Sequence, residues 1–157
     1  MPKKIKLGIL GGGGDSLIGV VHRIAAFIND NYEIVGGVFN PDKAVSIEFA
    51  QHIDIPTNRI YATVEELVAA ENALPEGERM QVVSILTPNF LHFPMAKTLL
   101  ENGFNVICEK PMTTTYEEAK EIAALQEKGG AIFALTHTYT GYPMVRQMRE
   151  MIRSGAI

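Results

Sequence analysis

Short apolar runs alternate with longer amphipathic stretches along this chain of 157 residues. Most runs are continuously apolar, which is typical of strands in a parallel sheet covered on both faces. They predict six strands, at residues 5–10, 34–39, 59–61, 82–86, 105–108 and 131–135. Strand followed by helix, repeated in this way, predicts an α/β fold: an open, doubly wound, mostly parallel six-stranded sheet with helices on both faces.

The stretches between the predicted strands carry helix start and stop signals. Thr63 with Glu66 has the spacing of a capping box, and so does Thr115 with Glu118 or, one residue earlier, Thr114 with Glu117. In doubly wound sheets, ligands bind beyond the carboxyl ends of the strands. We therefore expect a ligand edge made of residues 11–18, 40, 87–89, 109–111 and 136–139.

Composition and charge narrow the classes of partner. The chain is 46% hydrophobic and 20% charged with a net charge of −4, which indicates a globular domain without attraction to nucleic acid or anionic membranes. No stretch approaches the roughly 20 apolar residues that a membrane-spanning helix needs. The single cysteine, Cys108, suits a buried thiol in a reducing compartment, so we expect a cytoplasmic protein.

A glycine-rich segment, GGGGDSLIG, follows the first predicted strand and opens an apolar helix. Glycine backbone can approach a phosphate closely, and the free N–H groups of a helix start favour negative charge. The spacing departs from G-x-G-x-x-G, and a tight turn without a ligand is the alternative. The predicted dinucleotide contacts in this segment are Gly11, Gly12, Gly13, Gly14, Asp15, Ser16, Leu17 and Ile18.

Asn40 stands at the tip of the second strand, about where a ribose-reading residue belongs. It could bond a ribose hydroxyl, but Asn-Pro-Asp is also an ordinary helix-opening turn, and both interpretations stay open. No arginine follows to receive a 2′-phosphate, although Lys43 is near. The segment therefore favours NAD, with NADP as the alternative.

The histidines and the cysteine are the remaining candidates for catalysis or metal binding. Asn89 is expected to cap the next helix, and His92 in its first turn is more often structural than catalytic. His22 and His52 are expected to be surface or packing residues. No histidine pair has metal-site spacing with a carboxylate, and Cys108 has no second thiol, so we expect no metal.

The segment Glu109-Lys110-Pro111 directly follows an apolar strand. A surface ion pair is one interpretation, and such pairs contribute little. The other is a site, because an ammonium beside a bound nicotinamide can hydrogen-bond a substrate hydroxyl. Pro111 also makes a cis peptide bond available.

Three segments together, GGGGDSLIGVVHR, SILTPNFLH and VICEKPMTTTYEEA, resemble the Gfo/Idh/MocA oxidoreductases, the family of glucose-fructose oxidoreductase and inositol dehydrogenase. The resemblance runs from about Lys4 to the end. It implies a Rossmann fold whose residues 11–18 wrap a dinucleotide pyrophosphate. It further implies that the ribose and nicotinamide are lined by Thr87, Pro88, Asn89 and His92 and by Glu109, Lys110 and Pro111. Lys110 would be the catalytic residue, with a bond to Pro111 that is often cis.

The same resemblance implies hydride transfer between NAD(P) and a hydroxyl or carbonyl carbon of a sugar or polyol. Residues 1–140 would form the dinucleotide-binding domain, and residues 141–157 a helix toward a second domain that carries the catalytic base and lies outside this chain. The full-length form is expected to be a homo-oligomer. A non-catalytic dinucleotide-binding module is the main alternative, because fold alone does not determine function. A second alternative is that the glycine loop binds another nucleotide or a methyl donor.

Overall fold

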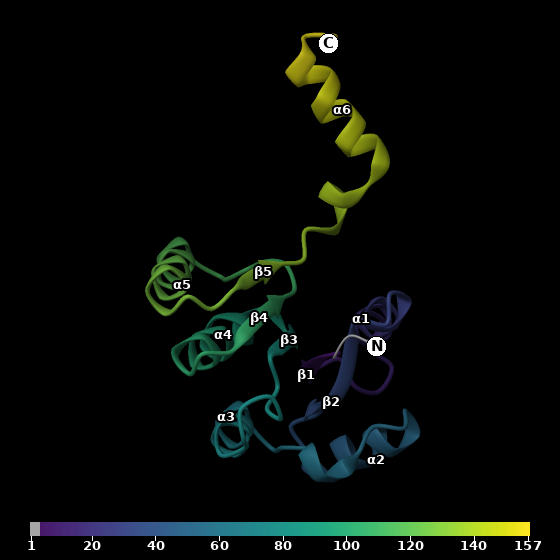
Figure 1. Cartoon of the computed structure of the whole chain (residues 1–157), viewed down its shortest axis with the longest axis vertical. Helices are drawn as coiled ribbons and strands as arrows, with labels where there is room; N and C mark the ends of the chain where they lie inside the picture. Colours follow the sequence, from purple (N-terminus) through teal and green to yellow (C-terminus); the bar gives the residue numbers. More distant parts are fainter. Residues whose placement is uncertain (1–3) are drawn as a thin grey trace.

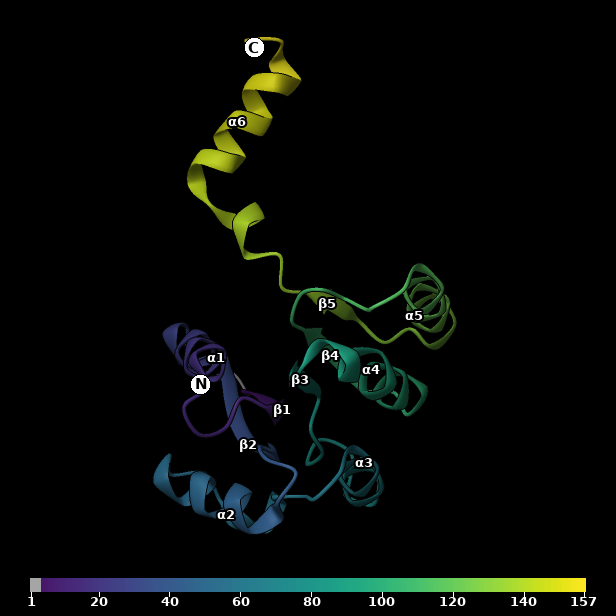
Figure 2. The ribbon, with the colours of Figure 1, turned by 180° about the vertical axis from the view of Figure 1, so that it is seen from behind.

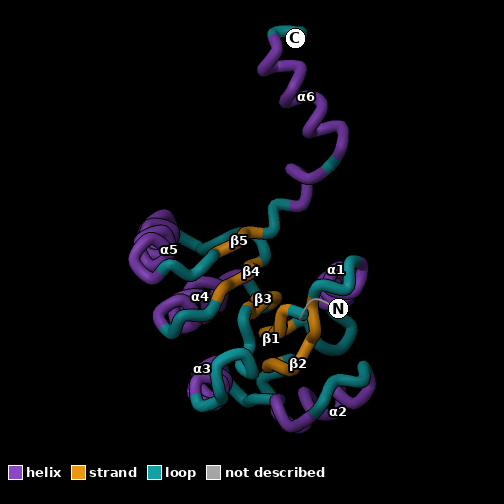
Figure 3. Tube along the Cα trace, in the orientation of Figure 1, coloured by secondary structure: helices purple, strands orange, loops and turns teal. Residues whose placement is uncertain are grey.

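The computed structural model describes residues 4–157, and its centre is one parallel sheet of five strands (Figure 3). The strands are β1 (Ile5–Gly11), β2 (Tyr32–Val38), β3 (Val82–Leu86), β4 (Asn105–Cys108) and β5 (Phe133–Leu135). Their order is β2-β1-β3-β4-β5, and all pairs are parallel. The chain winds outward in opposite directions from β1 and β3, so the carboxyl ends of these two strands mark the switch point where such sheets bind ligands.

Helices cover both faces of the sheet, as the sequence predicted. They are α1 (Leu17–Ile28), α2 (Lys43–His52), α3 (Val64–Asn72), α4 (His92–Glu101) and α5 (Tyr116–Gly129), and a further helix, α6 (Pro143–Ser154), follows the last strand. Three short 3₁₀ turns are η1 (Thr57–Arg59), η2 (Asn89–Leu91) and η3 (Thr138–Gly141). Figures 1 and 2 show α3, α4 and α5 on one side of the sheet and α1 on the other. None of the helices among residues 4–157 is long and apolar enough to cross a membrane.

The strand predicted at residues 59–61 is wrong. Arg59 ends the turn η1, and Ile60 forms only an isolated parallel bridge with Gly37. Thr63 then caps α3 by accepting a hydrogen bond from the Glu66 amide, so the chain leaves the sheet edge after a single bridge. The last strand is also shorter than predicted: the Ile132 amide donates to the side chain of Asn105 in β4 and not to a backbone carbonyl of that strand.

Two apolar clusters lie on opposite sides of the sheet. Leu10, Ile85 and Phe104 belong to the cluster under α3, α4 and α5, while Ile9 and Ile34 belong to the cluster that includes residues of α1 and α2. The continuous apolar runs are explained by this arrangement, because successive side chains of β1 alternate between two buried faces. The predicted capping box at the start of α5 is confirmed for Thr115 with Glu118.

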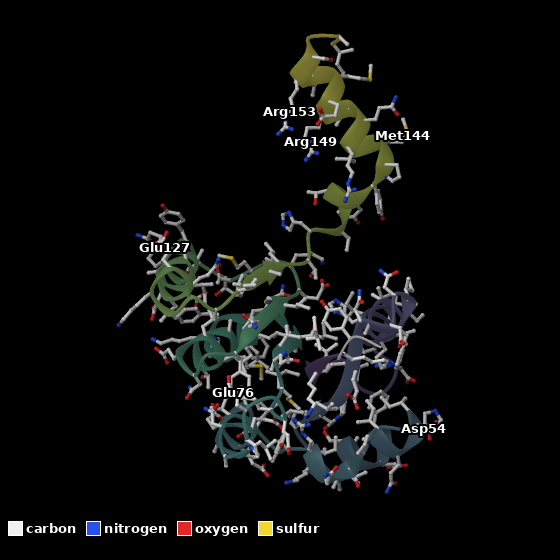
Figure 4. All side chains as sticks on the ribbon, in the orientation of Figure 1. Asp54, Glu76, Glu127, Met144, Arg149 and Arg153 are labelled. Carbon is white, nitrogen blue, oxygen red and sulfur yellow. The ribbon has the colours of Figure 1, made fainter. Side chains whose placement is uncertain are left out.

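The helix α6 runs away from the sheet, and none of its residues is buried (Figures 1 and 2). Its methionines are largely exposed, 71% for Met144 and 50% for Met148. Figure 4 shows Met144, Arg149 and Arg153 projecting from this helix, remote from the sheet. The site described next is therefore built without α6.

Candidate functional site

The glycine loop joins β1 directly to α1. Gly11, Gly12 and Gly14 have φ of 78°, 67° and 54°, a region that favours glycine. The loop also passes against the helix it opens: a Cβ on Gly19 would lie 1.9 Å from the carbonyl oxygen of Gly12. Ser16 caps α1 by accepting a hydrogen bond from the Gly19 amide at 3.2 Å. The loop is thus a tight turn that also presents a helix N-terminus at the ligand edge, which fits a pyrophosphate.

Two hollows adjoin over the carboxyl ends of the strands. One of about 690 Å³ is lined by Gly11, Gly12, Gly13, Ser16, Asn40, Thr87 and Pro88, among others. A smaller one of about 240 Å³ is lined by Ile18, Leu86, Thr87, Asn89, His92, Glu109 and Lys110. They share Leu86 and Thr87, and their linings extend from the tip of β2 to the end of β4; we call the two hollows together the trough.

A third hollow of about 820 Å³ lies on the α2 side of the glycine loop and includes Gly14, Asp15, Asn40 and His52 in its lining. The structure thus brings fourteen of the predicted site residues to these three hollows. Leu17 and Pro111 line none of them, and the Leu17 side chain is 78% exposed.

The turn at the tip of β2 confirms the turn interpretation of Asn40. Its Oδ1 accepts from the Asp42 amide at 2.9 Å, and Asp42 in turn caps α2. Lys43 pairs with Glu66 on α3 at 2.6 Å. The ammonium nearest Asn40 in sequence is therefore directed to another helix.

His92 has a structural role, as the sequence favoured. It is fully buried, with Nδ1 2.7 Å from the Pro111 carbonyl oxygen and Nε2 2.9 Å from that of Thr87. The ring thereby ties the loop after β3 to the loop after β4. The predicted cap at Asn89 is wrong, because Asn89 begins the turn η2 and no side chain caps α4.

The carboxylate of Glu109 is held inside the protein. Its Oε1 accepts from the Thr136 hydroxyl at 2.6 Å and lies 3.0 Å from His22 Nε2, and Oε2 accepts from the Lys110 amide at 3.3 Å. Burial alone would raise the pKa of the Glu109 carboxyl, but the hydrogen bonds from Thr136, His22 and the Lys110 amide lower it. A contact of Glu109 with a nicotinamide ribose stays a prediction.

Lys110 projects from the end of β4 and is exposed, and its peptide bond to Pro111 is cis. The surface ion pair of this segment is not formed, because Lys110 makes no salt bridge within residues 4–157. Its ammonium is therefore available to a ligand in the smaller hollow. Two residues before Lys110, burial and then the Glu109 charge raise the pKa of the Cys108 thiol to about 12, so this thiol is not a thiolate at neutral pH.

His22 is the site residue that sequence reasoning missed. Of the two expectations, surface or packing, the packing one is confirmed for His22: its ring is bonded at both nitrogens, with Nδ1 3.0 Å from Ser84 Oγ. Helical spacing carried a signal for it, because Ile18, His22 and the buried Ala26 share one face of α1. His52, by contrast, is exposed. In the described part of the chain, no three His, Cys, Asp or Glu residues are grouped as metal ligands.

The profile described as "Oxidoreductase family, NAD-binding Rossmann fold" (GFO_IDH_MocA) matches residues 5–148. The chain belongs to the Gfo/Idh/MocA oxidoreductase family. An uncharacterized oxidoreductase, YfiI, of Bacillus subtilis is 38% identical over 99% of this chain and 39% of its own length. The D-xylose 1-dehydrogenase (NADP(+)) of Hypocrea jecorina is 30% identical over 99% of this chain and 40% of its own.

Solved structures agree with this membership. An inositol dehydrogenase homolog from Azotobacter vinelandii, crystallised with NADH and myo-inositol, superimposes with a TM-score of 0.93 at 33% identity, over 99% of this chain and 41% of that one. The present Gfo/Idh/MocA chain spans about two fifths of the length of these relatives. The doubly wound fold and the NAD-binding Rossmann assignment are thereby confirmed.

Proposed function

We propose that this chain binds NAD along the trough, and that the protein it belongs to transfers hydride between the nicotinamide and a hydroxyl or carbonyl carbon of a sugar or polyol. The observation that carries this proposal is the meeting of the glycine loop and the unpaired Lys110 in adjoining hollows. A dinucleotide has the matching shape, a diphosphate between two nucleosides. Relatives named as xylose and inositol dehydrogenases support the substrate class.

The glycine loop would bind the pyrophosphate through backbone amides. The adenosine would lie in the hollow of about 690 Å³, next to Asn40, and the nicotinamide nucleoside in that of about 240 Å³. Because the turn uses Asn40 Oδ1, the amide NH₂ of that side chain is the group that can donate to a ribose hydroxyl.

Charges around Asn40 favour NAD over NADP. Asp15 and Glu48 line the hollow of about 820 Å³, which Asn40 lines as well, and their carboxylates would repel a 2′-phosphate on the adenosine ribose. Lys43 is paired with Glu66 and so offers no free cation. Since one relative is named for NADP(+), the preference needs a direct measurement.

Lys110 is the residue we assign to catalysis. When an alcohol is oxidised, its carbon gives a hydride to the nicotinamide and its hydroxyl gives a proton to a base. The Lys110 ammonium would hydrogen-bond the hydroxyl oxygen and stabilise the negative charge that develops on it. We place the base in a second domain. Residues 1–140 would form the dinucleotide domain, and residues 141–157 would lead from it to the second domain. Residues 1–3 lie outside the described part.

The remaining expectations are also proposals. A cytoplasmic location is supported by the buried single thiol of Cys108. The net charge of −4 supports the absence of nucleic-acid and membrane partners. Homo-oligomerisation of the full-length form rests on the family resemblance alone.

Titration of the chain with NADH, NADPH and S-adenosylmethionine, followed by nucleotide fluorescence or calorimetry, tests the proposal. We expect saturable binding of NADH, weaker binding of NADPH and none of the methyl donor. Lys110→Ala should lower turnover in a full-length protein far more than it weakens NADH binding. Preferential binding of S-adenosylmethionine, or no binding of either dinucleotide, would show that the proposal is wrong.

A further inference from the structure

The imidazole of His22 connects three elements of the site. It stands in the second turn of α1, just after the glycine loop, and its side chain is only 14% exposed. Nδ1 faces the Ser84 hydroxyl on β3 and Nε2 faces the Glu109 carboxylate after β4, both at 3.0 Å. The ring therefore links the helix at the proposed pyrophosphate site to the residue that precedes Lys110.

The two partners decide where the ring carries its proton. An ionised carboxylate only accepts hydrogen bonds, so Nε2 must donate to Glu109. Nδ1 of the neutral ring is then an acceptor, and the Ser84 hydroxyl can donate to it. The Nε2–H tautomer thus satisfies Ser84, His22 and Glu109 together, with Thr136 as the second donor to the carboxylate.

Serine, histidine and glutamate also occur together in hydrolytic triads, but that role does not fit here. A nucleophilic serine has to reach a substrate carbonyl. Ser84 is 1% exposed and lies within β3, between β1 and β4. The hydrogen bonds of this network end on the Glu109 carboxylate, so we look for its functional effect at Glu109.

Glu109 and Lys110 both line the hollow of about 240 Å³, and their opposite charges are one residue apart. A carboxylate turned into that hollow would pair with the Lys110 ammonium and fill the space of the nicotinamide nucleoside. In the structure the carboxylate is bound inward by His22 and Thr136 instead. This orientation leaves both the cation and the hollow free for ligands.

We propose that His22 is a positioning residue: it holds Glu109 inward and thereby keeps Lys110 and the nicotinamide end of the trough available. The proposal rests on the dinucleotide function proposed above. Because His22 lies on α1, the space for the nicotinamide nucleoside would also depend on the position of this helix, at whose N-terminus the pyrophosphate would bind.

The tautomer is tested first, on the unaltered chain without any ligand. Nitrogen-15 NMR of the imidazoles at neutral pH should show His22 protonated at Nε2 and not at Nδ1. A proton on Nδ1, or rapid averaging of the two tautomers, would overturn the proposal whatever the chain binds. This measurement is therefore independent of the dinucleotide function.

Binding of NADH is then compared with binding of ADP, which lacks the nicotinamide nucleoside. His22→Leu should weaken NADH about tenfold or more, the loss expected for a hydrogen bond to a charged group, and should leave ADP affinity within about twofold. His22→Gln retains an Nε2–H donor and should recover most of the NADH affinity. Thr136→Val removes the other side-chain donor to Glu109 and should show the same selective loss, even if His22→Leu does not fold.

Val21→Ala, at the exposed neighbouring position on α1, is the matched control and should bind both ligands as the unaltered chain does. Equal losses of NADH and ADP in His22→Leu and Thr136→Val would indicate a merely structural role and refute the proposal. Unchanged NADH affinity in both variants would refute it as well. Failure of the unaltered chain to bind either ligand would instead refute the proposed function, and with it the coupling to the nicotinamide end.

Discussion

Replacement of Glu71 by Gln should destabilise the fold more than any change at an exposed ion pair. The Glu71 carboxylate is fully buried, and its Oε1 accepts from Arg59 Nε at 2.9 Å and from the Tyr61 hydroxyl at 2.7 Å. Its Oε2 accepts from the Met80 amide at 2.7 Å and from the Arg59 guanidinium. One carboxylate thus joins α3 to the segment after β2 and to the segment before β3.

Glutamine has the same shape but replaces one oxygen by an NH₂ group, which would face donors. At least one buried donor then loses its partner, and Arg59 loses its counter-charge. Breaking a buried pair in this way costs about 3–5 kcal/mol, and we expect ~3 kcal/mol because the Arg59 side chain is 16% exposed. At a urea slope of roughly 2–3 kcal/mol/M, the midpoint of unfolding should fall by about 1 M.

Urea unfolding followed by circular dichroism measures this shift, with Glu121→Gln as the matched control. Glu121 pairs with Lys97 at the surface, and its removal should leave the midpoint unchanged within error. Equal midpoints for Glu71→Gln and the unaltered chain would refute the reasoning. So would an equally large shift in the control.

The pH dependence provides a second check on the same residue. Burial alone would raise the pKa of the Glu71 carboxyl, but hydrogen bonds from Arg59, Met80 and Tyr61 and the Arg59 charge lower it. A lowered pKa in the folded state stabilises the protein above the unfolded pKa of about 4.3, and this stability is lost as the pH falls through the folded value. The difference between the unaltered chain and Glu71→Gln should therefore shrink in acid and be full at neutral pH.

Three further predictions follow from single contacts. Gly19→Ala would place a Cβ 1.9 Å from the Gly12 carbonyl oxygen, so NADH binding should be lost in a titration, while Gly141→Ala, where a Cβ meets nothing within 4 Å, should bind normally. The Cys108 thiol, with its pKa raised to about 12 by burial and the neighbouring carboxylate, should react with a chromogenic disulfide only when urea unfolds the chain; prompt labelling of the native chain would contradict its burial. Thr115→Ala removes the cap of α5 and should cost about 1 kcal/mol in urea unfolding, whereas Thr115→Ser should cost little.

Local pattern was sufficient for most of the fold. The apolar runs predicted all five strands, and most clearly β1, β2 and β3, because most residues of these three are buried on both faces of the sheet, a property that shows in the run itself. The edge strand β5 is less buried, and its predicted bounds were too long. The predicted strand at 59–61 failed because a run of three residues cannot be told from one bridge followed by a helix cap. The glycine loop was predictable for a similar reason, since a backbone of positive φ restricts the residue type locally.

The sequence by itself also determined that Glu109 and Lys110 follow a strand and so lie at the ligand edge. Only the tertiary structure decided which way Glu109 points, because its partner His22 is 87 residues away and meets it through the packing of α1 on the sheet. The same holds for His92: the sequence pattern could place it in a helix, but it could not predict that its ring contacts the carbonyl oxygen of Pro111. Strand and helix patterns record what each residue does on its own element, whereas the direction of a polar side chain depends on partners that only the folded chain brings within hydrogen-bond distance.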